Sequence, residues 1–318
     1  MPIVVVTGAA TPLGRRVLAR FAATTGTRVV AVDEISADLK RTTEGADALV
    51  HLGDADDARE VFEAAGAAAV EQVVVASTAS VYGGWPDNSV PLTEEAPIRP
   101  NPGFDYATHH AEAERLAAEH REAHPGVRVA VLRFAPVLVP GEETWESRTL
   151  ASPPALRADD AVPPAQFLHV EDAASAVEHA VTAALDGTFN VAPDGFVAGE
   201  TARALAGGGI SIPVPDRLGR SLARLAWRLG LGSVTPTAEP YRTQPWVVAN
   251  DRFRATGWRP AYSNEEALVA TRKGSWWREL SPKRRQEVAL AVSGAGLVAV
   301  GAALVVLVRG ARRRRATR

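Results

Sequence analysis

Gly8, Thr11 and Gly14 are the first residues of the chain whose types and spacing could do chemistry. They follow residues 3–6, four consecutive β-branched residues, and lead into a helical run over residues 15–23. A turn between a buried strand and a helix aims backbone N–H groups and the helix dipole at any anion placed there. The pattern therefore predicts a phosphate-binding turn, in which Thr11 stands where a G-x-x-G-x-x-G spacing wants glycine. The alternative is a glycine pair required for steric reasons only.

Asp33 ends the next predicted strand, residues 28–33, and lies 19 residues beyond Gly14. An acid at about this spacing accepts the ribose hydroxyls of a bound dinucleotide. Glu34 follows with no adjacent arginine, so a 2′-phosphate would be repelled. We therefore expect NAD rather than NADP. An acid that ends a strand in water is the alternative.

Hydroxyl side chains come directly after another buried strand. Residues 72–76 predict that strand, and Ser77–Gly84 follow it with a serine, a threonine and a tyrosine among them. Open parallel sheets bind ligands at the carboxyl ends of their strands. A long helix over residues 106–124 and a strand over 127–133 complete the alternation, which predicts a doubly wound α/β sheet of the Rossmann type.

The predicted sheet is abbreviated in its first half. Only 14 residues, Glu34–Asp47, separate two strands, which leaves no room for a third strand with its own helix. We expect a dinucleotide-binding lobe over residues 1–140. Residues 141–275 then complete the sheet and form a small substrate lobe, and residues 276–318 form a membrane anchor with a basic tail.

Several segments resemble, in order, those of the extended short-chain dehydrogenase/reductase family, and most closely its NAD-dependent epimerase/dehydratase group. The resemblance covers about residues 3–271. It implies an oxidoreductase that uses NAD on a nucleotide sugar or related hydroxyl substrate. The segments that carry it are Thr7–Gly14, Asp33, Asp47–Leu52, Ser77–Gly83, Tyr106–His110, Leu132–Arg133, Gln166–Ala176, Gly187–Val191 and Thr256–Pro260.

The resemblance also implies roles for individual residues. Tyr106 would be the general acid/base and Thr78 the hydroxyl that binds the substrate oxygen. The family's lysine, which lowers the tyrosine pKa and holds the nicotinamide ribose, is replaced by His110. Neutral imidazole supplies no positive charge, so His110 is either a weaker substitute on the same helical face or a polar residue of a site that no longer turns over. The cofactor-binding set would be Gly8, Thr11, Gly14, Asp33, Leu52 and Ser77.

Composition restricts the remaining classes of function. The chain of 318 residues has no cysteine, which excludes disulfide and thiolate chemistry, and we expect no metal site. Residues 272–318 hold twelve basic residues and two acids, a net charge of +10, so residues 1–271 carry −12 of the total of −2. A mildly acidic body with a basic tail does not predict a nucleic-acid-binding protein.

Val288–Val308 is a run of 21 residues without charge or proline, flanked by arginines on both sides. At about 1.5 Å per residue it reaches roughly 30 Å, the thickness of a bilayer core. We expect a single C-terminal span that contacts membrane lipid. Six basic residues on each side leave its orientation tied by charge alone. The N-terminal residues enter a strand at Ile3 without a secretory signal pattern, and NAD is a cytosolic cofactor. Both favour a cytoplasmic catalytic lobe. A re-entrant or interfacial helix is the alternative to a full span.

Two hypotheses follow from the sequence. The first is a membrane-tethered, NAD-dependent epimerase/dehydratase-like oxidoreductase with a small-molecule substrate, for which a homodimer is one possible assembly. The second is a catalytically impaired NAD-binding or scaffold protein at the membrane, which His110 and the shortened cofactor half favour.

Overall fold

The computed structural model describes residues 1–24, 26–36, 38–151, 156–157, 162–206, 212–213, 221 and 235–271. Met1–Thr271 form one compact unit. The predicted span 288–308 and the basic tail lie outside the described residues. Among the helices that are described, none combines the length and the apolar character needed to cross a membrane.

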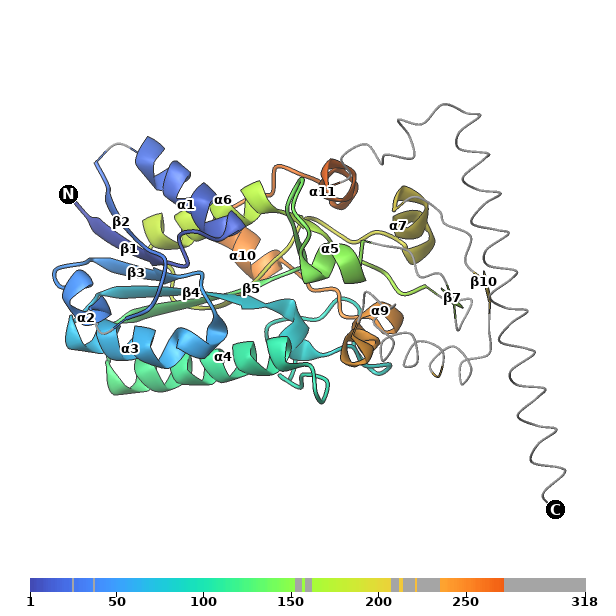
Figure 1. Cartoon of the computed structure of the whole chain (residues 1–318), viewed down its shortest axis with the longest axis horizontal. Helices are drawn as coiled ribbons and strands as arrows, with labels where there is room; N and C mark the ends of the chain where they lie inside the picture. Colours follow the sequence, from blue (N-terminus) through green and yellow to red (C-terminus); the bar gives the residue numbers. More distant parts are fainter. Residues whose placement is uncertain are drawn as a thin grey trace, which may run out of the picture. The chain divides into compact units, whose positions relative to one another are not determined.

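A parallel six-stranded sheet forms the centre of the unit (Figure 1). Its order is β2-β1-β3-β4-β5-β9, and each neighbouring pair is parallel. The strands are β1 (Ile3–Thr7), β2 (Arg28–Val32), β3 (Ala48–His51), β4 (Gln72–Thr78), β5 (Arg128–Phe134) and β9 (Gly187–Val191).

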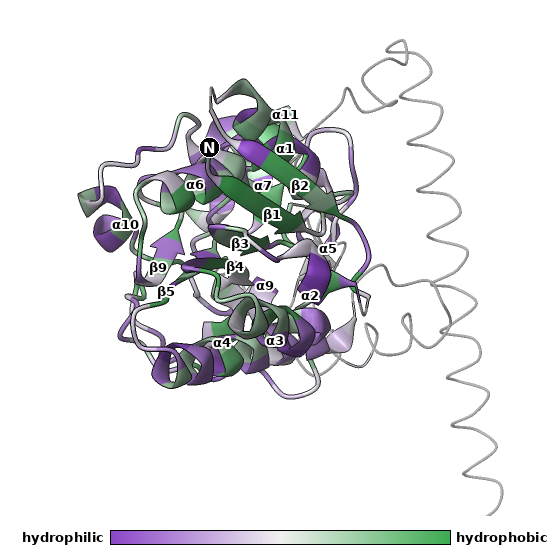
Figure 2. Ribbon diagram, turned by 90° about the vertical axis from the view of Figure 1, so that its left-hand side faces the viewer, coloured by the Kyte–Doolittle hydropathy of each residue, from purple (hydrophilic) through white to green (hydrophobic). Residues whose placement is uncertain are grey.

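Helices cover both faces of this sheet (Figure 2). Successive residues of β1 enter opposite cores: Val4 and Val6 pack on one face and Val5 on the other, as the two-residue period of a strand requires. One face holds α1 (Pro12–Ala23), α6 (Val170–Thr182) and α10 (Asp251–Ala255); the other holds α2 (Leu39–Thr42), α3 (Ala58–Ala67) and α4 (Asp105–Ala123). The predicted doubly wound α/β sheet is confirmed.

The abbreviated first half is confirmed as well. A single four-residue helix, α2, is the whole structured connection between β2 and β3, and Leu39 anchors it in the core at 3% exposure. No further strand lies outside β2 among the described residues. The sheet therefore ends one strand beyond β1, next to the turn that holds Gly8.

Two short parallel pairs and several short helices complete the fold. Figure 1 shows α5, α7 and α9 beyond the carboxyl ends of the main strands. The remaining elements are β6 (Val137–Leu138) paired with β8 (Leu168–His169), β7 (Leu156–Arg157) paired with β10 (Ile212–Pro213), α5 (Trp145–Thr149), α7 (Gly199–Leu205), α9 (Pro240–Thr243), α11 (Asn264–Ala270), and the 3₁₀ turns η1 (Ala55–Asp57), η2 (Ala79–Tyr82) and η3 (Pro236–Ala238).

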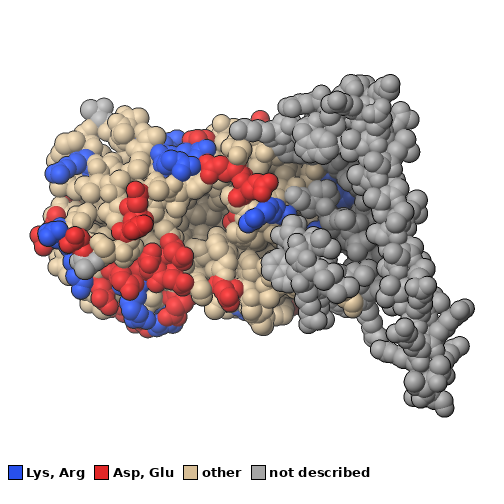
Figure 3. Space-filling view, viewed as in Figure 1, with Lys and Arg blue, Asp and Glu red and all other residues tan. Residues whose placement is uncertain are grey.

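The surface over α3 and α4 is acidic (Figure 3). Asp54, Asp56, Glu60, Glu63 and Glu112 are exposed there. This agrees with the negative charge that the sequence assigns to residues 1–271.

Candidate active site

The turn after β1 depends on close backbone approach. Gly8 has φ +69°, and a Cβ added to it would lie 2.5 Å from the Gly53 nitrogen. A Cβ added to Gly14 would lie 2.2 Å from the Gly8 carbonyl oxygen. Both glycines are thus required by packing, whether or not a phosphate binds. The sequence was compatible with a phosphate-binding turn and with glycines required for steric reasons only. The packing of the turn supports the steric interpretation and does not exclude phosphate binding.

Thr11 acts as the N-cap of α1. Its hydroxyl accepts the Gly14 N–H at 3.0 Å and donates to the Gly8 carbonyl at 2.7 Å. Pro12 follows at the first helical position and has no N–H to offer. The sequence predicted that the helix begins near Arg15; this cap explains why α1 instead begins at Pro12. Of the N–H groups of Pro12, Leu13 and Gly14, only that of Leu13 is neither absent nor already bonded to the cap. The turn therefore offers an anion fewer N–H groups than an uncapped helix start would.

Asp33 and Leu52 lie on either side of this turn. Asp33 is exposed just past the end of β2, whose Val32 carbonyl accepts the Ala9 N–H at 3.3 Å. Leu52 is 7% exposed and donates its N–H to the Thr7 carbonyl at 3.1 Å. Both positions predicted to bind the cofactor therefore reach the carboxyl edge of the sheet, beside Gly8.

His51 is a structural histidine next to them. Its Nε2 lies 2.9 Å from the Asp54 carbonyl and its Nδ1 lies 2.7 Å from the Thr7 hydroxyl. A carbonyl can only accept, so Nε2 carries the proton and Nδ1 accepts from Thr7. Burial lowers the pKa of His51 and keeps it neutral.

Tyr106 and Thr78 meet at the carboxyl edge of β4, as the resemblance implies. Tyr106 lies in the first turn of α4, and its hydroxyl is in side-chain contact with Thr78 and Glu146. Thr78 ends β4, where its hydroxyl accepts the Ser80 N–H at 3.1 Å. Tyr106 as a whole is 37% exposed, but its hydroxyl packs against Thr78 and Glu146; desolvation of that hydroxyl, followed by the nearby Glu146 charge, raises the pKa of Tyr106 above its ordinary value. Tyr106 is therefore a neutral phenol rather than a stored phenolate base.

His110 lies one helical turn beyond Tyr106, with the two ring centroids 4.7 Å apart. Its Nδ1 is buried and has no hydrogen-bond partner. Burial, together with the neighbouring His51, lowers the pKa of His110 to about 4. The imidazole is therefore neutral at pH 7, as expected from the sequence, and provides no positive charge to stabilise a phenolate.

Glu146 belongs to the site although no pattern in the sequence points to it. It lies in α5, whose start is fixed by a reciprocal cap between Thr144 and Ser147. Its side chain is in contact with Tyr106, and burial raises the pKa of Glu146 to about 7. The residue falls in a proline-rich segment without periodicity, so only the folded chain brings it to Tyr106.

Aromatic rings build the wall around Tyr106. The Trp145 ring lies 5.1 Å from the Tyr106 ring and 5.2 Å from that of Phe104, and Phe104 lies 4.8 Å from Tyr241 of α9. The Trp145 Nε1 is buried and faces the Tyr106 hydroxyl and the Glu146 carboxyl. Buried polar atoms normally find partners, so the His110 Nδ1 is an unsatisfied polar atom beside the same phenol.

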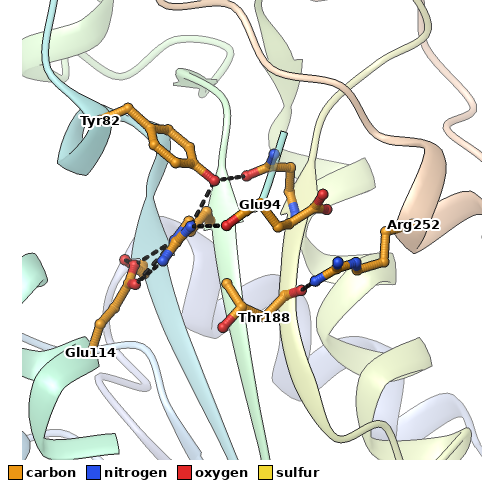
Figure 4. Close-up of polar contacts among 8 residues, drawn as sticks. Tyr82, Glu94, Glu114, Thr188 and Arg252 are labelled. Carbon is orange, nitrogen blue, oxygen red and sulfur yellow. Dashed lines mark hydrogen bonds and ion pairs between the residues drawn. The ribbon is translucent and has the colours of Figure 1, made fainter. Parts of the chain in front are cut away.

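Ser77 takes part in a different network. Its hydroxyl donates to Glu114 at 2.5 Å, and Glu114 forms a buried ion pair with Arg133 at 2.6 Å. Arg133 donates to the Tyr82 hydroxyl at 2.7 Å, which donates to Asn190 at 2.8 Å (Figure 4). This network ties α4 to β4, β5 and β9. The Ser77 side chain is thus engaged in the interior, and Arg133 and Asn190 have structural contacts.

Comparison with known proteins agrees with this geometry. Residues 53–192 match the sequence model of the NAD dependent epimerase/dehydratase family. Thr78, Tyr106, His110 and Glu146 fall inside that range, whereas the Gly8–Gly14 turn lies before it. Uncharacterized proteins of Mycobacterium tuberculosis and Mycobacterium bovis are 34% identical over 151 residues, which is 47% of this chain and 39% of theirs. The match therefore spans well under half of those relatives.

Solved structures of nucleotide-sugar enzymes share the fold. A UDP-glucose 4-epimerase of Thermus thermophilus, in complex with NAD, has a TM-score of 0.61 at 19% identity and covers 85% of this chain and 97% of its own. The UDP-Glc/GlcNAc 4-epimerase of Campylobacter jejuni gives 0.64 at 16%, covering 85% and 98%. A dTDP-glucose 4,6-dehydratase of Bacillus anthracis, in complex with NAD, gives 0.61 at 14%, covering 85% and 95%. The resemblance to the NAD dependent epimerase/dehydratase family is confirmed for residues 53–192, and the fold is shared with solved 4-epimerases of nucleotide sugars.

Proposed function

We propose that this protein is an NAD-linked oxidoreductase of the epimerase/dehydratase type that acts on a nucleotide sugar or a related hydroxyl compound. The observation that carries the proposal is the contact between Tyr106 and Thr78 at the carboxyl edge of β4. A phenol and a threonine hydroxyl at that place can bind one substrate oxygen between them. The unpartnered His110 Nδ1 marks the same place as one that a ligand would complete.

The residues present fit an NAD cofactor. Gly8 and Gly14 allow the tight turn after β1, Asp33 is exposed beside it, and the unpartnered His110 Nδ1 would accept a ribose hydroxyl. When bound, NAD would supply the acceptor for the hydride removed from the substrate carbon. Exposed Glu34 beside Asp33 disfavours a 2′-phosphate, which supports NAD over NADP. The capped turn argues for weak binding of the pyrophosphate.

The substrate class rests on the structural neighbours. The fold is shared with an enzyme described in complex with UDP-glucose and NAD, at 20% identity and a TM-score of 0.59, and with a Thermotoga maritima UDP-glucose 4-epimerase described with UDP-glucose. Of the aromatic wall, the half-buried Trp145 is the ring that could contact a base or a sugar face, while Phe104 and Tyr241 are buried and support it from the core.

A second candidate function is binding without turnover. Neutral His110 and the capped turn both weaken the arrangement that the family uses. A thermal-shift titration with NAD⁺, NADH and NADP⁺ separates the candidates at the level of binding. Tm should rise with NAD⁺ or NADH and less with NADP⁺; no rise with any of them contradicts both candidates.

Turnover separates the two candidates further. NAD-dependent conversion of UDP-glucose by the wild type should fall by about 10²-fold or more in Tyr106→Phe, because the variant loses positioned proton transfer. Tyr262→Phe, which keeps its ring stack on His169 at 3.9 Å, is the matched control and should convert UDP-glucose at the wild-type rate. Equal rates in the wild type and Tyr106→Phe would exclude an oxidoreductase that works through Tyr106.

We also propose that residues 288–308 tether the protein to a membrane with the catalytic unit on the cytoplasmic side. The tether rests on the uncharged run of 21 residues, and the cytoplasmic side rests on the proposed use of NAD, because the flanking basic residues are equal in number.

A further inference from the structure

Glu146 is the buried ionisable group nearest to the proposed chemistry, and the family resemblance gives it no role. It keeps only 9% of its surface exposed. Its carboxyl is in contact with the Tyr106 hydroxyl, and the ring of the adjacent Trp145 packs on the Tyr106 ring. The reciprocal cap between Thr144 and Ser147 fixes the turn that carries it. The carboxyl is therefore held in place by packing rather than free to swing into solvent.

Without Glu146, the described residues of the site include no group that could accept a proton from Tyr106. The general base of an alcohol oxidation must accept a proton near neutral pH. Tyr106 cannot store a phenolate, because burial and the Glu146 charge both oppose its ionisation. Neutral His110 offers no cation that would reverse this.

We propose that Glu146 is the proton acceptor of Tyr106, and that the phenol stays neutral and relays the proton of the substrate hydroxyl to the Glu146 carboxylate. This inference rests on the proposed function, since it assigns the proton pathway of that reaction. Glu146 acts through Tyr106 and is a positioning residue in that sense.

The step conserves atoms and charge. The substrate O–H bond breaks and its proton binds the Tyr106 oxygen, while the phenol's own proton moves to Glu146 and converts the carboxylate to a carboxylic acid. The C–H bonding pair leaves with its hydrogen as a hydride to the nicotinamide cofactor proposed above, and the substrate becomes a carbonyl compound. Tyr106 ends the step as it began, as a neutral phenol.

The surroundings of Glu146 place its titration in the useful range. The described groups that face its carboxyl are Tyr106 from α4, and Thr144 and Trp145 from its own segment. None of these is a cation, and burial is the largest cause that raises the pKa of Glu146 to about 7. A carboxylate that ionises near pH 7 is both available and basic enough at neutral pH. The rate of substrate oxidation should therefore rise as the pH increases through about 7.

A spectroscopic titration tests the coupling without cofactor or substrate. In the full chain labelled with ¹³Cζ-tyrosine, the Tyr106 signal, assigned by its loss in Tyr106→Phe, should shift with an inflection near pH 7 as Glu146 ionises. The inflection should disappear in Glu146→Gln and persist in Glu143→Gln, which changes an acid three residues away in the sequence. A wild-type signal without an inflection between pH 5 and 9 overturns the inference and requires no variant to fold.

Kinetics with UDP-glucose and NAD⁺ distinguish this inference from the proposed function. Glu146→Gln should lower turnover at pH 8 by about 10²-fold and remove the rise through pH 7, whereas Glu143→Gln should retain both. A wild type that turns over, with Glu146→Gln matching its rate and pH profile, overturns the inference and leaves the proposed function standing. A wild type without turnover, in which the Tyr106 inflection depends on Glu146, supports the coupling and contradicts the proposed substrate.

Discussion

His110 and Glu146 have opposite pKa shifts on either side of Tyr106. Burial lowers the pKa of His110 from 6.5 to about 4 and raises the pKa of Glu146 from 4.5 to about 7. Between about pH 4.5 and 6.5, the folded chain therefore lacks a proton at His110 that the unfolded chain holds, and holds one at Glu146 that the unfolded chain lacks. The two contributions to the pH dependence of the free energy of unfolding offset each other in the wild type.

Single substitutions should reveal each contribution. Relative to the wild type, Glu146→Gln should gain free energy of unfolding as the pH rises from 4.5 to 7, because the cost of ionising a buried carboxyl is gone. His110→Phe should gain free energy of unfolding as the pH falls from 6.5 to 4, because no buried imidazole then resists protonation. Urea denaturation at several pH values measures both. Differences from the wild type that do not vary with pH would contradict the assigned burial effects.

The residues of the site differ in how far the sequence could reveal them. Tyr106, Thr78 and His110 were indicated by the family resemblance, and the helical period places Tyr106 and His110 on one face. Glu146 had no such signal. Its contact with Tyr106 joins residues 40 positions apart through a short helix whose cap, rather than its periodicity, sets its position. Ser77 fits the motif, but its side chain meets Glu114 in the interior.

The N-terminus of α1 is the element at which the proposed dinucleotide would compete with the helix cap. The Thr11 hydroxyl already satisfies the Gly14 N–H, and Pro12 removes another donor. A good cap stabilises the helix by about 1 kcal/mol, but it occupies the hydrogen-bond donor that a phosphate would use. Helix stability and anion affinity are therefore in competition at this turn.

Thr11→Gly should shift that competition towards binding. The variant frees the Gly14 N–H and opens space above it, so the Kd for NAD⁺ should fall by about tenfold, the equivalent of one hydrogen bond to a charged group. The loss of helix stability should be only a few tenths of a kcal/mol, because glycine is itself a tolerated N-cap. Isothermal titration calorimetry measures the first effect and thermal melting the second.

Thr11→Val is the matched control for this prediction. It removes the cap hydroxyl but keeps a β-branched side chain at the same place, so it should destabilise the helix without the gain in affinity. Equal NAD⁺ affinity in Thr11→Gly and the wild type would show that the pyrophosphate does not use this turn.

At the scale of the whole molecule, charge and hydropathy are divided unevenly along the chain. Residues 1–271 carry a net charge of −12 and contain the sheet and the candidate site, whereas residues 272–318 carry +10 and contain the uncharged run 288–308. The acidic surface over α3 and α4 belongs to the first part (Figure 3). The second part lies outside the described residues, so its association with a membrane stays a prediction from the sequence.

Deletion of residues 288–318 tests that prediction. The truncated chain should appear in the soluble fraction after ultracentrifugation of lysed cells, and the full chain in the membrane fraction, because about 21 apolar residues suffice to span a bilayer core. The melting temperature of the truncated chain serves as the control for folding. Truncated protein that still sediments with membranes, at an unchanged melting temperature, would refute the tether.

The sequence by itself determined the sheet and its abbreviated first half, while Tyr106 and Thr78 were indicated by the family resemblance. These depend on local patterns: two-residue and helical periodicity, the 14 residues between two strands, and motifs at strand ends. The tertiary structure alone decided that Thr11 caps α1, that Ser77 faces the interior, and that Glu146 lies against Tyr106. Each of these depends on which groups share a buried space, because burial shifts a pKa and occupies a donor in ways that spacing along the chain does not encode.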